Sequence, residues 1–399
     1  MARTPDPSSI GVVGGGQLAW MLASAARSLN VPLHVQTPGL LDPATTLATS
    51  VVLAGLDDVG ATRELARRST AITFENEWVD LSALAPLSFD GVAFLPSLEA
   101  LSPLVSKRSQ RQLLQNLGLP CPRWIELPVD GELPEGFSYP VMAKVSTGGY
   151  DGKGTAVLRG ADDLKALLAR VAASDWILEE FVAFELELSQ LACRDRAGNV
   201  QCYPLVQTHQ HQQVCDWVMA PAAVPHAVQA YARNIAASLL TAINYVGVLS
   251  IEFFYGPGGL QVNEIAPRTH NSGHYTIEAA RTSQFEQQVR IVAGLPMGPV
   301  ELSVPGALMV NLLGFESSAS DYKDQRDALA ALPGAHVHWY GKQGSSPGRK
   351  LGHVTLLLQG SSPEERGSQA KLLLEGVRVI WPLPPALPSP VDPIVVEPA

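Results

Sequence analysis

The first hundred residues alternate short apolar strands with helical stretches, and this alternation constrains the fold more than any other feature. The segments "SIGVVG" and "PLHVQT" have the apolar content of buried strands. Between them, "QLAWMLASAARSL" spaces its apolar side chains as one face of a helix does; they are Leu18, Met21, Leu22 and Ala25. "AITF" and "VAFLP" continue the strand pattern. Strands that alternate with helices predict a parallel sheet covered by helices.

The rest of the chain is expected to form further domains, because 399 residues exceed one average domain. A helix around residues 107–117 leads to a proline-marked break, "GLPCPRW". The strands "PVMAKVS", "TAVLR" and "WILEEF", with the helix "ADDLKALLARV", predict a compact α+β unit. The strands "FELELSQLACRD", "VQCYPLVQTH", "YVGVLSIEFFYG" and "LQVNEIAPR", with a helix over roughly 225–242, predict a second one.

The C-terminal part contains three more strand-like segments, "GALMVNLLG", "AHVHWYGK" and "RKLGHVTLLL", which predict a small β-rich domain. From Pro382 onward the chain is rich in proline, so this tail is expected to be extended and mostly unordered. The expected parts are a Rossmann-like domain at 1–103, the two α+β units at 104–182 and 183–304, the C-terminal domain at 305–381 and the tail at 382–399.

Composition excludes several classes of partner. A net charge of −10 disfavours broad binding to nucleic acid, which needs basic surface. No run approaches the length of a membrane span, and the opening "MARTPDPSS" lacks the apolar segment of a signal peptide. The four cysteines show no C-x-x-C spacing and suit packed thiols in a reducing compartment. We therefore expect a cytoplasmic protein with no membrane partner.

A glycine-rich turn follows the first strand and opens the first helix. Gly14, Gly16 and Ala19 match the G-x-G-x-x-A spacing of a dinucleotide-binding turn. That interpretation also needs an acidic residue at the end of the second strand, whereas this strand ends in Gln36 and Thr37. Two alternatives therefore stay open, a phosphate of another ligand at the helix N-terminus and a tight turn without a ligand.

A second glycine-rich segment, "TGGYDGKG" at residues 147–154, lies between two predicted strands. It has more glycine than a turn requires, which suits a flap whose amides close over phosphates, and it lacks the spacing of a P-loop. Lys144 lies just upstream in an otherwise apolar strand, where a lysine is costly unless an anion pairs with it. The alternative is a long hairpin connection.

Two acidic residues occupy neighbouring predicted strands. Glu252 in "LSIEFF" and Glu264 in "VNEIAPR" lie on strands joined by a tight glycine turn, so pairing brings them side by side. Glu264 shares its alternation with Leu260 and Val262, which predicts that it points with the apolar residues. Desolvated carboxylates that repel one another suit a divalent cation, and magnesium prefers such oxygen ligands. The alternative is a pair of salt-bridged core acids.

Three further segments carry polar side chains. The segment "APRTHNSGH" follows the second acid and is either a substrate-facing segment or a solvated loop; its polar residues are Arg268, His270, Asn271, Ser272 and His274. "HWYGKQGSSPGRKLGH" is either a phosphate-binding turn or a basic surface turn, with Lys342, Arg349 and Lys350. Glu179 and Glu180 close the strand in "WILEEF", where they suit hydrogen bonds to an adenine or a ribose, or are surface charges.

The order of these features resembles the ATP-grasp superfamily, in which two α+β subdomains clamp Mg-ATP. Within it, "GGYDGKG", "NEIAPRTHNSGH" and "HWYGK…PGRKLGH" are similar to the 5-(carboxyamino)imidazole ribonucleotide synthase family of purine biosynthesis, from about Ile10 to about Leu358. The resemblance implies an N-terminal Rossmann-like domain, a lid subdomain at 104–182, a catalytic subdomain at 183–304, a small C-terminal domain and a homodimer.

The resemblance also implies roles for individual residues. Those expected to bind ATP are Lys107, Lys144, Gly149, Tyr150, Asp151, Gly152, Lys153, Gly154, Thr155, Glu179, Glu180, Phe181, Val182, Glu187, Gln210, Asn263 and Glu264. The magnesium ligands are Glu252 and Glu264. Those expected around the ribonucleotide and bicarbonate are Gly16, Gln17, Leu18, Glu75, Tyr150, Asp151, Arg268, His270, Asn271, Lys342, Arg349 and Lys350. Arg268, His270 and Lys342 are the expected catalytic residues.

The implied reaction joins bicarbonate to 5-aminoimidazole ribonucleotide at the expense of ATP. Bicarbonate is expected to attack the γ-phosphate and give carboxyphosphate, which yields carbon dioxide beside the amine. His270 is expected to relay the amine proton, Arg268 to steady the carboxyphosphate, and the 147–154 loop to exclude water. The alternatives are another ATP-grasp ligase, such as a formate-dependent glycinamide ribonucleotide transformylase, and a non-catalytic Rossmann-type nucleotide-binding protein.

Overall fold

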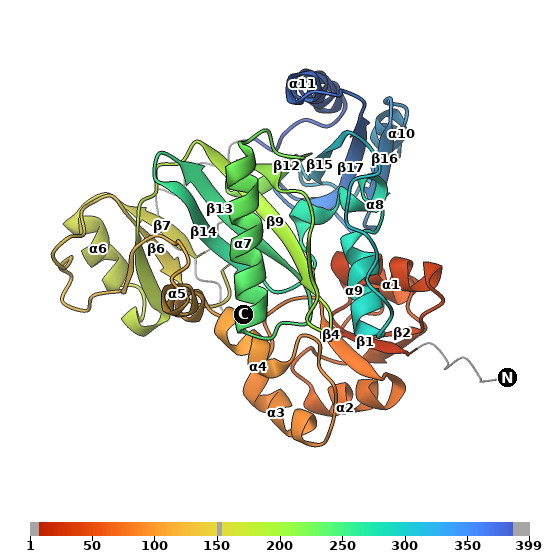
Figure 1. Ribbon diagram of the computed structural model, residues 1–399, viewed down its shortest axis with the longest axis horizontal. Coiled ribbons are helices and arrows are strands. Elements are labelled where there is room, and N and C mark those ends of the chain that lie inside the picture. Colours follow the sequence, from red (N-terminus) through yellow and green to blue (C-terminus); the bar gives the residue numbers. More distant parts are fainter. Residues whose placement is uncertain (1–7, 150–153, 386–399) are drawn as a thin grey trace.

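The computed structural model of the chain describes residues 8–149 and 154–385. Residues 150–153 of the glycine-rich loop and 386–399 of the predicted tail lie outside the described residues, so the expectations for them stay predictions. Three sheets organise the described chain (Figure 1). Within the described ranges, no helix combines the length and the apolar character that a membrane crossing requires.

The N-terminal domain is built on a sheet of four parallel strands, as the sequence predicts. In spatial order the strands are β3 (Ser50–Leu53), β2 (Leu33–Thr37), β1 (Ile10–Val13) and β4 (Ala71–Phe74). Its helices are α1 (Gln17–Ser28), α2 (Val59–Arg68), α3 (Leu81–Phe89) and α4 (Leu98–Leu101), with short 3-10 turns at Pro43–Thr46 and Ser102–Leu104.

Two details of this domain differ from the prediction. The strand predicted at "VAFLP" is wrong, because Phe94 forms only an isolated bridge to Ile72. Pro96 has no backbone N–H with which to extend that pairing. The edge strand β3 was not predicted, and none of its four residues is fully buried, so it carries little apolar pattern.

The second sheet belongs to a separate antiparallel unit, drawn in yellow at one end of the molecule (Figure 1). Its strands run in the order β5 (Trp124–Glu126), β8 (Trp176–Glu180), β6 (Val141–Val145) and β7 (Thr155–Leu158). Helix α6 (Ala161–Leu168) packs on it through Leu164 and Leu167, and a 3-10 turn covers Ala173–Asp175. Helix α5 (Lys107–Asn116) connects this unit to the N-terminal domain. The predicted lid subdomain is thus a sheet of its own.

The largest sheet has nine strands and extends through the C-terminal part. Its spatial order is β14 (Gly259–Ala266), β13 (Gly247–Gly256), β9 (Leu186–Arg194), β11 (Val206–His211), β12 (Val214–Ala220), β15 (Gly306–Leu313), β17 (Lys350–Leu358) and β16 (Ala335–Trp339), with β10 (Val200–Cys202) paired to β9. The strand predicted at "VQCYPLVQTH" is therefore two strands, interrupted where Pro204 lacks an N–H. Strand β12 was not predicted.

Helix α7 (His226–Ala242) crosses one face of this sheet in Figure 1. It buries Ile235, Leu239 and Leu240 against Leu249 and Ile251 of β13. Full burial of each such side chain stabilises the fold by roughly 1.5–3 kcal/mol. With this face committed to the core, the strands turn their alternate residues toward the site.

Helix α9 (Gln284–Val292) joins the N-terminal domain to the large sheet. Its Phe285 and Val289 share a buried cluster with Leu18 and Leu22 of α1, and α1 and α9 lie side by side in Figure 1. The short helix α8 (Thr276–Ala279) and a 3-10 turn at Asn271–Gly273 precede it. This packing fixes the start of α1 close to the ends of β13 and β14.

The C-terminal part has the three predicted strands and also two helices that were not predicted, α10 (Lys323–Ala330) and α11 (Pro363–Ile380). Helix α11 begins with a capping box, in which Ser362 and Glu365 exchange hydrogen bonds, and with Pro363 in its first turn. Those start signals are visible in the sequence. The strands of this part extend the central sheet rather than forming an independent one.

Candidate active site

The two predicted metal ligands lie directly opposite one another on the edge pair of the large sheet. Glu252 of β13 pairs in register with Glu264 of β14. A bulge follows, because Phe253 pairs with Val262 and leaves Asn263 as the extra residue. The bulge reverses the alternation, so the prediction that Glu264 points with Val262 into the core is wrong. Both carboxylates lie on the face opposite the apolar core, because their neighbours Ile251, Phe253 and Ile265 belong to that core.

The charges around this pair are unevenly balanced. Lys107 of α5 places its Nζ 2.7 Å from Oε1 of Glu264. Burial opposes ionisation of Glu264, but the Lys107 ammonium, with the charges of Lys144 and Arg111, outweighs it and lowers the pKa of that carboxyl. Burial, helped by the charges of Glu264 and Glu187, raises the pKa of Glu252 to about 7. Burial likewise raises the pKa of Glu187 on β9 to about 7.

A closed ring of four residues lies beside the pair. Lys144 donates to Oε2 of Glu179 at 2.8 Å and to Oδ1 of Asn263 at 3.0 Å. Arg111 donates to Oε1 of Glu179 at 2.6 Å and to the backbone oxygen of Asn263 at 2.5 Å. Burial opposes the charge of Glu179, yet the two cations lower its pKa to about 2. The sequence predicts an anion beside Lys144, and in this structure that anion is the carboxylate of Glu179.

Sequence reasoning missed Arg111, which is 1% exposed. Its position four residues after Lys107 puts both cations on one face of α5, and that spacing was the available signal. Burial lowers the pKa of Lys144, and Glu179 only partly offsets this. Glu180, next to Glu179, instead forms an ion pair with Arg123 at the surface.

The described ends of the glycine-rich loop adopt backbone conformations that favour glycine. Gly148 and Gly154 have φ of +76° and +75°. A side chain at Gly154 would overlap with Val145, whereas one at Gly148 would meet open space. Thr155 follows and donates to Oε1 of Gln213 at 3.0 Å. The predicted ligand contacts of Tyr150, Asp151, Gly152 and Lys153 lie outside the described residues.

The remaining residues predicted for ATP are divided between the lid and the large sheet. Gly149 is part of the described loop, and Phe181 and Val182 follow β8, where Phe181 is 47% exposed. Gln210 lies at a bulge of β11, opposite Cys215 of β12. Glu187 pairs in register with Phe254, two residues beyond Glu252 on β13.

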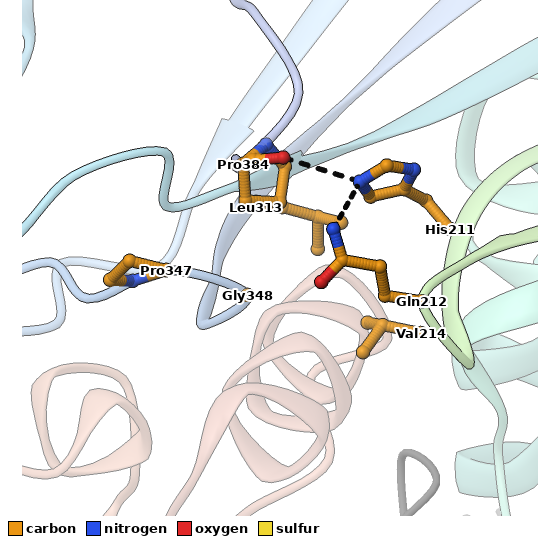
Figure 2. A pocket seen from close by; sticks show the side chains of 7 residues that line it. All are labelled: His211, Gln212, Val214, Leu313, Pro347, Gly348 and Pro384. Atoms are coloured by element: carbon orange, nitrogen blue, oxygen red, sulfur yellow. Dashed lines mark hydrogen bonds between the residues drawn. The ribbon is translucent and has the colours of Figure 1, made fainter. Parts of the chain in front are cut away.

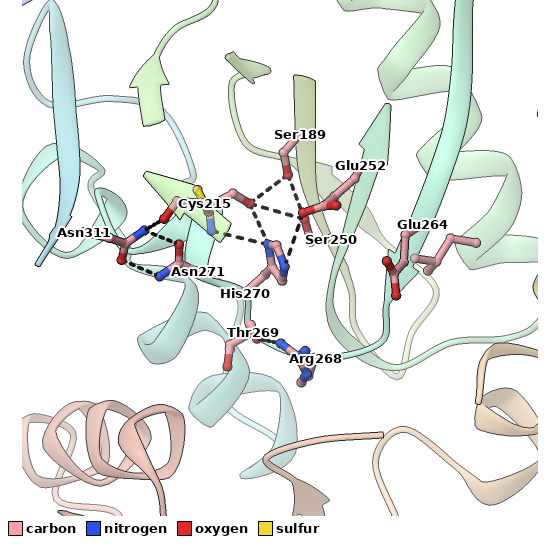
Figure 3. A network of polar contacts seen from close by, with 12 residues as sticks. Ser189, Cys215, Ser250, Glu252, Glu264, Arg268, Thr269, His270, Asn271 and Asn311 are labelled. Carbon is pink, nitrogen blue, oxygen red and sulfur yellow. Dashed lines mark hydrogen bonds and ion pairs between the residues drawn. The ribbon is translucent and has the colours of Figure 1, made fainter. Parts of the chain in front are cut away.

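The segment after β14 brings Arg268 and His270 to the acidic pair. Arg268 donates to Oε2 of Glu77 at 2.7 Å, and sequence reasoning missed Glu77. The Nε2 atom of His270 lies 3.6 Å from Oε1 of Glu252 (Figure 3). Burial, together with the charges of Arg268 and Lys350, lowers the pKa of His270 well below its ordinary value.

Asn271 connects this segment to the C-terminal part. It exchanges two hydrogen bonds with Asn311 of β15, at 2.9 and 2.7 Å. Asn311 also donates to the backbone oxygen of Cys215 on β12 (Figure 3). The C-terminal part thus supports the segment that carries Arg268 and His270.

The three basic side chains of the C-terminal turn, Lys342, Arg349 and Lys350, differ in the groups with which they interact. Lys342 donates to the backbone oxygen of Lys350 at 3.0 Å, and Arg349 donates to those of Gln343 and Gly344. Lys350, at the start of β17, is the member whose charge acts on both Glu252 and His270. The charge of Lys350 therefore reaches the site in this state.

The start of α1 is occupied by a side chain of the protein itself. Glu75 accepts hydrogen bonds from the backbone N–H groups of Gly16 at 2.7 Å, Leu18 at 3.1 Å and Ala19 at 3.3 Å. Gln17 is the first helical residue. A side chain at Gly14 or Gly16 would collide with Glu75. The glycines of this turn thus make room for a carboxylate, and burial raises its pKa despite these donors.

The donor set fits a cation held jointly with a ligand. Among residues 8–149 and 154–385, no three histidine, cysteine, aspartate or glutamate side chains converge as a complete metal site. Glu252 and Glu264 nevertheless supply carboxylate oxygens, and a bound cation would favour the ionised form of Glu252, whose pKa burial raises. Magnesium is commonly held by one or two carboxylates plus substrate phosphates.

A small cavity lies away from this cluster, between the β11–β12 hairpin and the C-terminal turn (Figure 2). Its volume is about 40 Å³, enough for one or two waters but not for a nucleotide. His211, next to Gln212 in that hairpin, contacts the backbone oxygen of Pro384. None of the described residues predicted for ATP, the metal or the ribonucleotide is among those that line this cavity.

Comparison with known proteins agrees with this arrangement. The ribonucleotide synthetase preATP-grasp domain matches residues 8–103, the ATP-grasp domain matches 112–285, and the phosphoribosylaminoimidazole carboxylase C-terminal domain matches 307–365. The fold and the site thus define an ATP-grasp ligase, an enzyme that forms carbon–nitrogen bonds.

Individual relatives narrow the family. The N5-carboxyaminoimidazole ribonucleotide synthase of Synechococcus elongatus is 51% identical over 96% of this chain and 97% of its own. The synthetase of Thermus thermophilus is 34% identical, with a TM-score of 0.82 over 95% of this chain and 99% of its own. The Aspergillus clavatus synthase, solved with ADP and 5-aminoimidazole ribonucleotide, is 29% identical, with a TM-score of 0.83 over 94% and 99%. The chain belongs to the N5-carboxyaminoimidazole ribonucleotide synthase family.

Proposed function

We propose that this chain carries out the ATP-dependent carboxylation of 5-aminoimidazole ribonucleotide, which gives N5-carboxyaminoimidazole ribonucleotide in purine biosynthesis. The observation that carries the proposal is the pairing of Glu252 with Glu264 between Lys107 and His270, in a chain of this family. This arrangement supports the proposal because it brings together carboxylate oxygens that suit a cation, a lysine that suits a phosphate and a polar segment that suits the acceptor.

ATP lies between the lid sheet and the large sheet in this proposal. Lys107 and Lys144 contact its phosphates, since both ammonium groups now rest on carboxylates that a phosphate can replace. The described residues Gly149, Gly154, Thr155, Phe181, Val182, Glu187 and Gln210 surround the nucleotide, together with Glu179, Glu180 and Asn263. The expected contacts of residues 150–153 belong to the same proposal.

Glu252 and Glu264 are the residues that hold magnesium. When bound, the ion neutralises charge on the phosphates during transfer. The protein supplies the geometry, because the cross-strand pair is fixed by the β13–β14 ladder. Lys107 lowers the pKa of Glu264, whereas burial raises that of Glu252, and a bound cation would favour the ionised form of both carboxyls.

Bicarbonate and the ribonucleotide occupy the side of Arg268 and His270. A bicarbonate oxygen attacks the γ-phosphate of ATP, the bond to the β-phosphate oxygen breaks, and carboxyphosphate and ADP form. Carboxyphosphate then splits into carbon dioxide and inorganic phosphate. The amine attacks carbon dioxide, and its proton leaves as the carbamate forms. Arg268, buried and ion-paired with Glu77, is oriented to steady the carboxyphosphate.

The ribonucleotide itself extends toward the N-terminal domain and the C-terminal turn. Gly16, Gln17, Leu18 and Glu75 are proposed to meet its ribose side. Asn271, Lys342, Arg349 and Lys350 are proposed to meet the rest, including its phosphate. The hydrogen bonds of Lys342 and Arg349 to turn carbonyls preorganise that turn.

The assembly and the boundaries are also proposals. We propose a cytoplasmic homodimer, divided at 1–103, 104–182, 183–304, 305–381 and 382–399. The resemblance to the family supports both the homodimer and the domain boundaries. Sedimentation equilibrium of the purified chain tests the dimer, and a monomer mass at working concentration would contradict it.

The test of the function is a coupled assay. Purified protein, Mg-ATP, bicarbonate and 5-aminoimidazole ribonucleotide should release ADP and form the carboxylated product in equal amounts. Omission of the ribonucleotide should remove most ADP release. ADP release that ignores the ribonucleotide, or formate that replaces bicarbonate, would reject the proposal.

A further inference from the structure

Three buried serine side chains form a connected cluster behind His270. Ser189 of β9 lies 2.8 Å from Ser250 of β13 and 2.7 Å from Ser272, measured between Oγ atoms. Ser272 Oγ lies 2.9 Å from Nδ1 of His270. All three serines are at most 1% exposed. Figure 3 shows Ser189 and Ser250 next to the His270 ring, on the side where Glu252 lies.

The contacts of the ring define which nitrogen carries the proton. The backbone N–H of Ser272 donates to Nδ1 of His270 at 3.3 Å. A backbone N–H is always a donor, so Nδ1 must be the acceptor and the proton of the neutral ring lies on Nε2. The hydroxyl of Ser272 can also donate its proton to Nδ1. Its oxygen can then accept a proton from the hydroxyl of Ser189, which in turn contacts that of Ser250.

The backbone of His270 is held independently of the serines. Gln284 accepts from the His270 N–H at 2.8 Å and donates to the His270 carbonyl at 2.7 Å. The serines therefore act on the ring rather than on the chain path. A serine substitution should leave the main chain in place and free the ring to rotate or change tautomer.

We propose that Ser189, Ser250 and Ser272 are positioning residues that hold His270 as a hydrogen-bond donor through Nε2. This rests on the proposed function and deepens it. In that state His270 donates through Nε2 to an oxygen of the bicarbonate-derived carboxyl group. Nε2 already carries a proton, so it does not accept the amine proton, and His270 is not the proton relay expected from the sequence. The amine proton passes instead to the phosphate dianion released from carboxyphosphate, which balances the step.

The first measurement needs no substrate. Long-range proton–nitrogen NMR of protein labelled on its nine histidines reports the tautomer of each ring, and His270→Asn assigns the signal. We expect wild-type protein to show the proton on Nε2, and Ser272→Ala to show a mixture of tautomers. A proton on Nδ1 in the wild type would overturn the proposal.

The second measurement is the ratio of carboxylated product to ADP. Ser272→Ala should lower this ratio about tenfold, while the KM for Mg-ATP stays near that of the wild type. Ser189→Ala, one hydroxyl further from the ring, should have a smaller effect. Thr62→Val is the matched control, since it removes a buried hydroxyl bond to Gln36 in the N-terminal domain.

The two failures can be told apart. An unchanged product ratio in Ser272→Ala would overturn the positioning role, even with a changed tautomer. Wild-type ATP hydrolysis that does not depend on the ribonucleotide would reject the proposed function, whereas the tautomer signal would still test the serine cluster. Equal losses in Ser272→Ala and Thr62→Val would mean general destabilisation and would also overturn the proposal.

Discussion

At the scale of residues, the site is a set of charges that satisfy one another before a ligand arrives. Lys107 rests on Glu264, and Lys144 rests on Glu179. Glu252 has no cation within ion-pair distance among the described lysines and arginines, and its side chain is 26% exposed. The free protein therefore resists the ionisation of Glu252, as it resists that of Glu187.

The first residue-scale prediction concerns Glu252→Gln and pH. The folded pKa is about 7 and the ordinary value 4.5, so ionising Glu252 costs stability as pH rises through this window. Below pH 4.5 the cost is absent, and above pH 7 it is complete. A shift of this size corresponds to about 3 kcal/mol, and solvent screening of the partly exposed side chain reduces it. The variant should thus be more stable than wild type by about 2 kcal/mol at pH 8, and equally stable below pH 4.5.

Denaturant unfolding of ligand-free protein across that pH range measures this difference. Glu187→Gln is the parallel variant, because burial raises the pKa of Glu187 to the same level. A stability difference that grows toward low pH would contradict the assignment.

The second residue-scale prediction concerns Glu264→Ala. Loss of this carboxylate leaves Lys107 without its partner and the proposed cation with a single protein oxygen donor. The rate of carboxylation should fall at least about a hundredfold, as is typical when one electrostatic group is removed from a reaction centre. The circular dichroism spectrum should stay unchanged. Glu64→Ala, an exposed acid on α2, is the control. Near-normal turnover would refute the role.

At the scale of elements, the lid sheet and the large sheet are joined by buried polar contacts and by the apolar face of α5, which packs on the core of the large sheet through Leu114. Arg111 of α5 connects Glu179 on β8 with Asn263 on β14. Beyond these contacts the lid has its own sheet and its own apolar core. An element built this way can move as a body about its attachment, as closure over a nucleotide requires.

The element-scale prediction compares two glycines with the same backbone strain. Gly148→Ala and Gly154→Ala both place a side chain at positive φ, but only the second also meets Val145. Gly154→Ala should therefore raise the KM for Mg-ATP severalfold more than Gly148→Ala does. Steady-state kinetics at saturating ribonucleotide measures it. Equal effects would show that backbone strain alone matters there.

At the scale of the whole molecule, the C-terminal part is an extension of the catalytic sheet. Strand β15 pairs with β12, so the sheet has no natural edge near residue 305. Trp381 is fully buried and donates to the backbone oxygen of Leu313. Removal of this part would expose one edge of β12 along its length.

The whole-molecule prediction follows from that edge. A chain that ends at residue 304 should aggregate or unfold, whereas one that ends at residue 385 should match the full chain in melting temperature. Size-exclusion chromatography and thermal unfolding compare the two. A soluble, folded 1–304 fragment would contradict the continuity of the sheet.

Sequence patterns predicted the elements that carry strong periodicity and the residues that carry unusual chemistry. The pairing of Glu252 with Glu264 followed from two strands and a short turn. The orientation of Glu264 did not, because a bulge adds one residue without a sequence mark. Arg111 and Glu77 were missed for another reason. Their partners lie 68 and 191 residues away in sequence, and only the folded chain brings them together.

The carboxylate of Glu75 at the start of α1 has a consequence for selectivity. A pyrophosphate brought to this helix would meet a resident anion already bonded to three main-chain amides. A sugar hydroxyl, by contrast, would meet an acceptor. The N-terminal domain therefore has the fold of a dinucleotide-binding domain but disfavours the dinucleotide itself. Nicotinamide cofactors at cellular concentrations should not inhibit this enzyme.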